Sequence, residues 1–166
     1  MCGIAGHFGP NAPTPEAVRK TLALMGRRGP DDNGTRGITA GDNKLSLLHT
    51  RLAIIDLDHR AAQPFVSDGL SLIFNGEIYN YVELRNQLVD MGHRFKTDSD
   101  TEVLLKAFKQ WGTACFAKLE GMFALALYDE NSHTVTLARD AFGEKPLYTL
   151  FDGHDLYFGS EIKYLY

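Results

Sequence analysis

The chain has 166 residues, enough for one domain with a sizeable core. Its composition of 44% hydrophobic, 23% charged and 11% aromatic residues is ordinary for a globular protein. A formal net charge of −4 with no basic run argues against nucleic acid and anionic membranes as partners.

The same inventory argues against export and metal binding. The longest apolar run, residues 122–128, is far shorter than the roughly 20 residues that span a bilayer. Met1 is followed directly by Cys2, without the basic region of a secretory signal. We therefore expect a cytoplasmic protein with its two cysteines, Cys2 and Cys115, reduced, and Cys115 packed in the core. The six histidines show no metal-ligand spacing, so no metal site is expected.

The first elements in chain order are a strand, a helix and a loop. Residues 3–8 form an apolar segment that predicts a strand starting at the chain terminus. Residues 15–25 place apolar side chains on one helical face after a proline in the first turn. Residues 27–34 (RRGPDDNG) combine turn-forming residues and predict a loop.

Apolar segments continue through the middle of the chain. Residues 45–48 and 52–57 are two such segments, separated by His49, Thr50 and Arg51. Residues 70–74 predict a strand, closed by the turn signal Asn75-Gly76.

Two helices are predicted next, each from capping-box spacing. Asn80 and Glu83 have this spacing at the start of a helix predicted over about residues 81–91. Ser99 and Glu102 repeat the spacing ahead of a second apolar helical face.

The remainder of the chain is rich in predicted strands. Residues 122–128 are apolar throughout, as in a strand covered on both faces, and residues 134–138, 147–151 and 156–158 follow. Ser160 precedes a short terminal helix. Because strands and helices come in blocks, an α+β fold of two packed sheets covered by helices is favoured over a doubly wound parallel sheet.

Cys2 is the sharpest chemical feature. Removal of Met1 would give it both a thiol and a free α-amine, whose ordinary pKa values are about 8.5 and 7.7–8.0. The amine could then activate the thiol as an N-terminal nucleophile, directly or through a water. By itself, Cys2 is equally compatible with an incidental small apolar residue at the start of a strand.

Three further features complete a site for a free amino acid amide. The Asn75 side chain and the Gly76 N–H could form an oxyanion hole, although the pair alone favours a hairpin turn. Arg51 could bind a carboxylate. Asp100 could bind an ammonium group, although alone it fits a carboxylate that complements a helix dipole.

The sequence motifs around these residues resemble those of the class II, N-terminal nucleophile, glutamine amidotransferases. MCGIAG opens the chain, RRGPDDNG is similar to their RGPD loop, and HTRLAIIDL is similar to their arginine-bearing segment. FNGEIYNY, DSDTEVLL, LEGMFALALYD, RDAFGEKPLY and FGSEIK resemble successive motifs of the asparagine synthetase branch. The pattern departs at Ala141, where the family has arginine, and at Leu48-His49-Thr50.

The resemblance implies a four-layer αββα sandwich and a role for each matched residue. It implies Cys2 as nucleophile with its amine as base, and Asn75 and Gly76 as the oxyanion hole. Glutamine would be held by Arg51 at its α-carboxylate and by Asp100 and Glu77 at its α-amine. The pocket would be lined by the stretch that contains Leu52, Ile54 and Ile55.

The resemblance further implies that residues 1–166 are a glutaminase domain that hydrolyses L-glutamine and passes ammonia to a synthetase domain or subunit. No cofactor is expected here, because ATP and Mg²⁺ would belong to the synthetase domain, which this chain lacks. Homodimerisation is left open. Two alternatives stay open too: a non-catalytic regulatory module, and an N-terminal nucleophile hydrolase that cleaves a different amide.

Overall fold

The computed structural model describes residues 1–53 and 59–165. The strands are β1 (Gly3–Gly9), β2 (Asp32–Ala40), β3 (Asn43–Arg51), β4 (Phe65–Ser67), β5 (Leu70–Ile78), β6 (Gly121–Asp129), β7 (Thr134–Arg139), β8 (Tyr148–Phe151) and β9 (Leu156–Gly159). The α-helices are α1 (Pro15–Met25), α2 (Tyr81–Asp90) and α3 (Asp100–Trp111), and the 3₁₀ helices are η1 (His59–Ala61), η2 (Gly112–Lys118) and η3 (Ile162–Tyr164).

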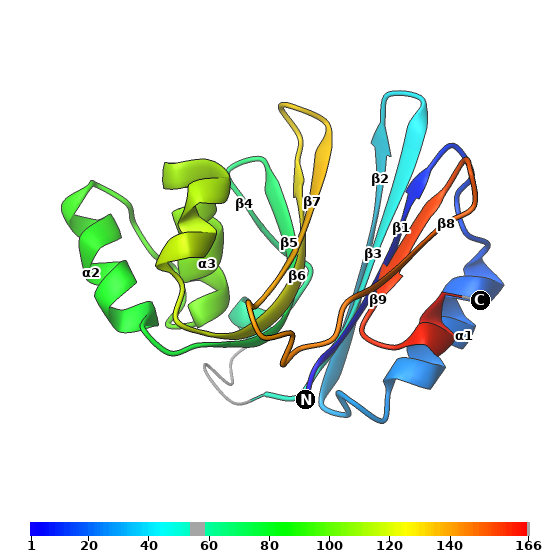
Figure 1. The fold of residues 1–166 in the computed structure, drawn as a ribbon, viewed down its shortest axis with the longest axis horizontal. Helices are drawn as coiled ribbons and strands as arrows, with labels where there is room; N and C mark the ends of the chain where they lie inside the picture. The colour runs from blue at the N-terminus through cyan, green and yellow to red at the C-terminus, as the bar shows by residue number, and fades with distance from the viewer. Residues whose placement is uncertain (54–58, 166) are drawn as a thin grey trace.

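The strands form two antiparallel sheets that pack face to face. One has the order β2-β3-β1-β9-β8 and the other the order β4-β5-β6-β7. Helices α2 and α3 cover the outer face of the four-stranded sheet, while α1 and η3 cover the outer face of the five-stranded sheet (Figure 1). The predicted four-layer αββα sandwich is therefore confirmed.

Strand periodicity divides the apolar residues between three cores. In β5, Leu72 and Phe74 point to the helices, whereas Ile73 points to the opposite sheet. In β1, Ile4 joins that same intersheet core, while Ala5 packs beneath α1. By the same alternation, the side chains of Cys2, just before β1, of Arg51 in β3 and of Asn75 in β5 face the opposite sheet. The alternation thus sends the predicted site residues of both sheets into one interface.

The predicted elements agree with the structure except where a non-local contact overrides a local signal. Asn75-Gly76 forms no turn, because β5 continues to Ile78 and pairs with β6 along its whole length. The predicted loop over residues 27–34 ends early, because Asp32 already pairs with Arg51 in β3. The predicted segment 52–57 falls mostly outside the described residues.

The two predicted capping boxes behave differently. Ser99 Oγ accepts a hydrogen bond of 3.2 Å from the Glu102 N–H and caps α3 as predicted. The Asn80 cap is wrong, because its side chain instead bonds the backbone of Lys118 and Glu120. Across the described ranges, no helix is both long and apolar enough to cross a membrane.

Candidate active site

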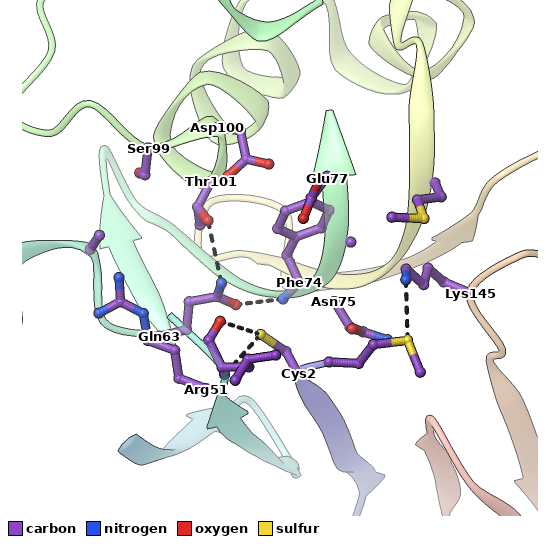
Figure 2. A pocket seen from close by; sticks show the side chains of 15 residues that line it. Cys2, Arg51, Gln63, Phe74, Asn75, Glu77, Ser99, Asp100, Thr101 and Lys145 are labelled. Carbon is purple, nitrogen blue, oxygen red and sulfur yellow. Dashed lines mark hydrogen bonds between the residues drawn. The ribbon is translucent and has the colours of Figure 1, made fainter. Parts of the chain in front are cut away.

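A pocket of about 120 Å³ opens where the ends of β1 and β3 meet β5 and the first turn of α3. Its volume is below the usual range for drug-sized ligands, about 300–1,000 Å³, and is suited to a small metabolite. In Figure 2, Asn75 and Lys145 lie to the right of Cys2, Arg51 lies to its left and Asp100 lies above it. The lining residues are Met1, Cys2, Arg51, Leu52, Ala61, Gln63, Phe74, Asn75, Gly76, Glu77, Ser99, Asp100, Thr101, Met122 and Lys145.

Cys2 presents its thiol to this pocket from the start of β1. Its Sγ lies 3.4 Å from the Leu52 N–H donor and 3.6 Å from the Leu52 carbonyl oxygen. Burial raises the pKa of the Cys2 thiol, although the Leu52 N–H and the nearby positive charges oppose the rise. The thiol is therefore mainly protonated at neutral pH and needs a base to become nucleophilic.

Arg28 fixes the backbone of Cys2. Its Nε donates a 3.0 Å hydrogen bond to the Cys2 carbonyl oxygen, and its Nη1 forms a 3.1 Å ion pair with Glu161. A planar guanidinium can make both contacts with little freedom of movement. Cys2 is thus held on two sides, by Arg28 and by the pairing of β1 with β3, which begins at the next residue, Gly3.

Three backbone N–H groups of β5, those of Phe74, Gly76 and Ile78, point away from β6. The residue opposite Gly76 is Phe123, and both its N–H and its C=O bond Asp140, at 3.1 and 2.8 Å. Gly76 and Phe123 are therefore a non-hydrogen-bonded pair, and the Gly76 N–H faces the other edge of β5. Strand β4 pairs only with Leu70–Leu72, so it does not cover that edge here.

Side chains satisfy the two outer N–H groups. Gln63 Oε1 accepts from the Phe74 N–H at 2.6 Å, and Asp100 Oδ2 accepts from the Ile78 N–H at 3.1 Å. The Gly76 N–H lies between them, directed away from β6 and toward the pocket. One donor of the edge is thus available to a ligand.

Asn75 supplies a second available donor beside it. The residue is 1% exposed, and its Nδ2 has no hydrogen-bond partner within the part of the chain that the structure describes. A buried amide without a partner costs about 1–3 kcal/mol, which a bound oxygen would recover. Only glycine fits at position 76, because a Cβ there would lie 2.1 Å from the Met122 carbonyl oxygen.

Two charged groups, one from β3 and one from α3, also line the pocket. Arg51, at the end of β3, is 8% exposed, and Asp100, in the first turn of α3, is 6% exposed. Burial raises the pKa of Asp100 to about 6, and the nearby Glu77 adds to the rise, against the hydrogen bonds from Ile78 and Thr101. A ligand with a positive group beside Asp100 would relieve this penalty, and an anionic group suits Arg51.

The structure brings the predicted residues Cys2, Arg51, Leu52, Asn75, Gly76, Glu77 and Asp100 into this pocket, whereas Ile54 and Ile55 lie outside the described residues. Sequence reasoning missed Gln63 and Lys145. Gln63 also donates to Thr101 Oγ1 at 3.3 Å, so it joins β5 to α3. The FGEKPLY motif was the available signal for Lys145, whereas no local pattern marks Gln63.

Groups outside the pocket have structural roles. His49 is 1% exposed between the sheets, and burial lowers its pKa to about 4, so it is neutral at pH 7. Cys115 is fully buried in the core beneath α3, as predicted. Among the residues described, no group of three or more His, Cys, Asp or Glu side chains could hold a metal ion.

Comparison with known proteins identifies the family. The family described as "Glutamine amidotransferase domain" matches residues 1–166. The chain belongs to this family. Amidotransferase relatives include the glutamine-hydrolysing asparagine synthetase 1 of Bacillus subtilis, 39% identical over 99% of this chain, and asparagine synthetase B of Escherichia coli, 40% identical over 99%. The chain spans only 26% and 30% of the lengths of these two proteins.

Solved structures support the fold assignment. The amidotransferase domain superposes on the glutamine phosphoribosylpyrophosphate amidotransferase of Bacillus subtilis with a TM-score of 0.80 at 23% identity. It also matches the structure of an allosteric regulatory enzyme of purine biosynthesis with a TM-score of 0.82 at 22% identity. Each match covers 98% of this chain and 42% of the other. The chain therefore shares its fold with these two solved structures.

Proposed function

We propose that this domain hydrolyses L-glutamine to glutamate and ammonia, with Cys2 as the nucleophile after Met1 has been removed. One observation carries the proposal: the Cys2 thiol shares its pocket with two adjacent donors. These are Asn75 Nδ2, which has no partner among the described residues, and the Gly76 N–H, which points away from β6. A nucleophile beside two such donors is the arrangement that acyl transfer from an amide requires.

The α-amine of the processed Cys2 takes the thiol proton, and the sulfur attacks the side-chain carbonyl carbon of glutamine. The oxygen of the tetrahedral intermediate carries the negative charge and accepts hydrogen bonds from Asn75 and Gly76. The ammonium of Cys2 then protonates the leaving nitrogen, the C–N bond breaks, and ammonia departs from a γ-glutamyl thioester. Water, deprotonated by the same amine, hydrolyses the thioester and releases glutamate.

Free glutamine suits the charges of the pocket. Arg51 binds the α-carboxylate, while Asp100 and Glu77 bind the α-ammonium group, which also favours the ionised form of Asp100. A peptide-bound glutamine lacks both charged ends and could not make these contacts with Arg51, Asp100 and Glu77. The substrate is therefore the free amino acid and not a protein side chain.

The similarity to glutamine-hydrolysing asparagine synthetases supports a second step, in which the released nitrogen is used. Residues 1–166 act as the glutaminase domain, and their ammonia passes to an ATP-dependent synthetase domain or subunit of the asparagine synthetase type. ATP and Mg²⁺ belong to that partner, whereas the hydrolysis uses only groups of this chain. Both cysteines are free thiols, which suits the reducing cytoplasm.

The test compares Cys2→Ala with Cys115→Ala, after mass spectrometry has established that Met1 is removed. Cys2→Ala should abolish release of glutamate from glutamine, and a glutamine-mimicking electrophile should label the wild type at Cys2 in a 1:1 ratio. Cys115→Ala, whose thiol is buried away from the pocket, should retain turnover. Turnover by Cys2→Ala would overturn the nucleophile assignment. A wild type with Met1 removed, but without turnover or labelling, would point to a non-catalytic module.

A further inference from the structure

Lys145 is a buried lysine at the nucleophile end of the pocket. It is 6% exposed, and its Nζ lies 3.3 Å from the sulfur of Met1 (Figure 2). Among the residues that the structure describes, no carboxylate forms an ion pair with it. Lysines are seldom buried without an anionic partner, because desolvating the charge is costly. Its position therefore needs a functional explanation.

The side chain of Asp140 holds the backbone of Lys145 in place. The carboxylate of Asp140 accepts hydrogen bonds from the N–H groups of Phe142, Glu144 and Lys145, at 3.1, 2.9 and 3.0 Å, and so closes the loop after β7. It also accepts from the Phe123 N–H at 3.1 Å. Phe123 lies opposite Gly76, so one carboxylate ties Lys145 to the strand pair that carries the two available donors.

Met1 is bonded to the nitrogen of Cys2, which is the base of the proposed reaction once it is a free amine. Lys145 contacts the side chain of Met1, the residue joined to the nitrogen of Cys2, and both residues line the pocket. Removal of Met1 takes away this contact and leaves a free α-amine on Cys2 at the same end of the pocket. A nearby positive charge disfavours protonation of an amine.

We propose that Lys145 is a positioning residue whose ammonium keeps the α-amine of the processed Cys2 in its neutral, proton-accepting form. The inference rests on the proposed function, since that amine is the base of the reaction. An α-amine ordinarily has a pKa of about 7.7–8.0, so most of it would be protonated near pH 7. A base works best when its pKa lies close to the working pH, which Lys145 would bring about.

Other charged groups also face this amine. Arg28 bonds the Cys2 carbonyl, but its charge is balanced by Glu161 at 3.1 Å. Arg51 and Asp100 act on the Cys2 thiol with opposite signs, and Glu77 adds a second negative charge to the pocket lining. The effect of Lys145 is therefore best measured as the difference between charged and neutral side chains at that one position.

The experiment titrates the amine directly in the 166-residue chain. Cysteine labelled with ¹³C at Cα gives two signals, from Cys2 and Cys115, and Cys115 lies in the core as a reference for folding. Wild type, Lys145→Gln, Lys145→Met and Lys145→Arg are compared across pH 5–10, with removal of Met1 checked by mass spectrometry. The pH profile of kcat/KM for glutamine is measured on the same samples.

Both neutral variants should raise the titration midpoint of the Cys2 signal by about one pH unit and move the acidic limb of the profile by the same amount. Lys145→Arg should keep both near the wild-type values. In the two neutral variants, KM should change less than kcat. An unchanged midpoint in a neutral variant whose Cys115 signal is native would overturn the inference and leave the glutaminase assignment standing. A shifted midpoint without turnover in the wild type would instead refute the proposed function alone.

Discussion

Replacing Asn75 by alanine separates a catalytic asparagine from a structural one. The side chain is buried, and its Nδ2 has no partner among the described residues, so the fold gains no hydrogen bond from that donor. The proposed reaction, by contrast, uses that donor only when an oxyanion forms. We therefore expect Asn75→Ala to reduce turnover strongly while leaving the protein about as stable as before.

The magnitudes differ enough to be measured. Loss of one oxyanion donor lowers kcat by roughly 10²–10³-fold, about 2.7–4 kcal/mol. For stability, removing a buried donor without a partner relieves a penalty of about 1–3 kcal/mol, which offsets the van der Waals packing that the amide provides. The free energy of unfolding should change by less than about 1 kcal/mol.

Asn80→Ala is the matched control. The Asn80 side chain donates to the Lys118 carbonyl at 2.9 Å and accepts from the Glu120 N–H at 3.1 Å, away from the pocket. Its removal should cost about 1–2 kcal/mol of stability and leave kcat within two-fold. Glutaminase assays and urea unfolding of both variants measure the two effects. If Asn75→Ala keeps kcat within a few-fold, or loses stability as Asn80→Ala does, the oxyanion role is refuted.

Two further predictions concern Asp100 and Gly76. Because burial raises the pKa of Asp100 to about 6, the folded state binds more protons than the unfolded state between about pH 4 and 6. The stability contributed by Asp100 should therefore decrease as pH rises through this window, and Asp100→Asn should remove the decrease in urea unfolding measured from pH 4 to 7. Glutamine binding needs the carboxylate, so its Kd for the inactive Cys2→Ala protein should rise roughly ten-fold per pH unit below pH 6; a pH-independent Kd in calorimetry would contradict the ammonium contact. Gly76→Ala should lose about 1–3 kcal/mol of stability, because its Cβ would meet the Met122 carbonyl, whereas Gly37→Ala, with open space around its Cβ, should change it by less than about 0.5 kcal/mol; equal values in thermal unfolding would rule out the close approach.

Periodicity and capping signals predicted most of the fold. The unbroken apolar run over 122–128 became β6, covered by helices on one face and by the other sheet on the opposite face. The predicted Ser99 cap is found at the start of α3. Such features depend on interactions within a few residues, or on burial alone, and these leave a clear pattern in a single sequence.

Asn75-Gly76 shows where local signals fail. The pair has strong turn propensity, but nine consecutive positions of β5, from Leu70 to Ile78, pair with β6. Non-local pairing outweighs the local preference, and the glycine is needed for a close approach between strands instead of for a turn. The chemical argument for these two residues nevertheless located them in the pocket, because it relied on donor geometry.

Gln63 could not have been predicted by the same reasoning. Its amide bonds the backbone of Phe74 and the side chain of Thr101, which lie 11 and 38 residues away in sequence. Nothing near Gln63 in the chain signals that a buried edge donor of β5 needs an acceptor at that point. Residues that complete a hydrogen-bond network become apparent only when the three-dimensional arrangement is known.

The division of the pocket between two sheets makes its geometry depend on how far apart they lie. Cys2 and Arg51 belong to one sheet and Asn75 to the other, and the spacer between them includes the small, fully buried side chains of Ala124 and Ala126. A bulkier side chain at position 124 or 126 would push the two sheets apart. It would thereby shift the Cys2 sulfur relative to the oxyanion donors without contacting them. A displacement of about 1 Å can lower the rate about 10²-fold. The rate of the proposed reaction should therefore depend on the distance between the two sheets.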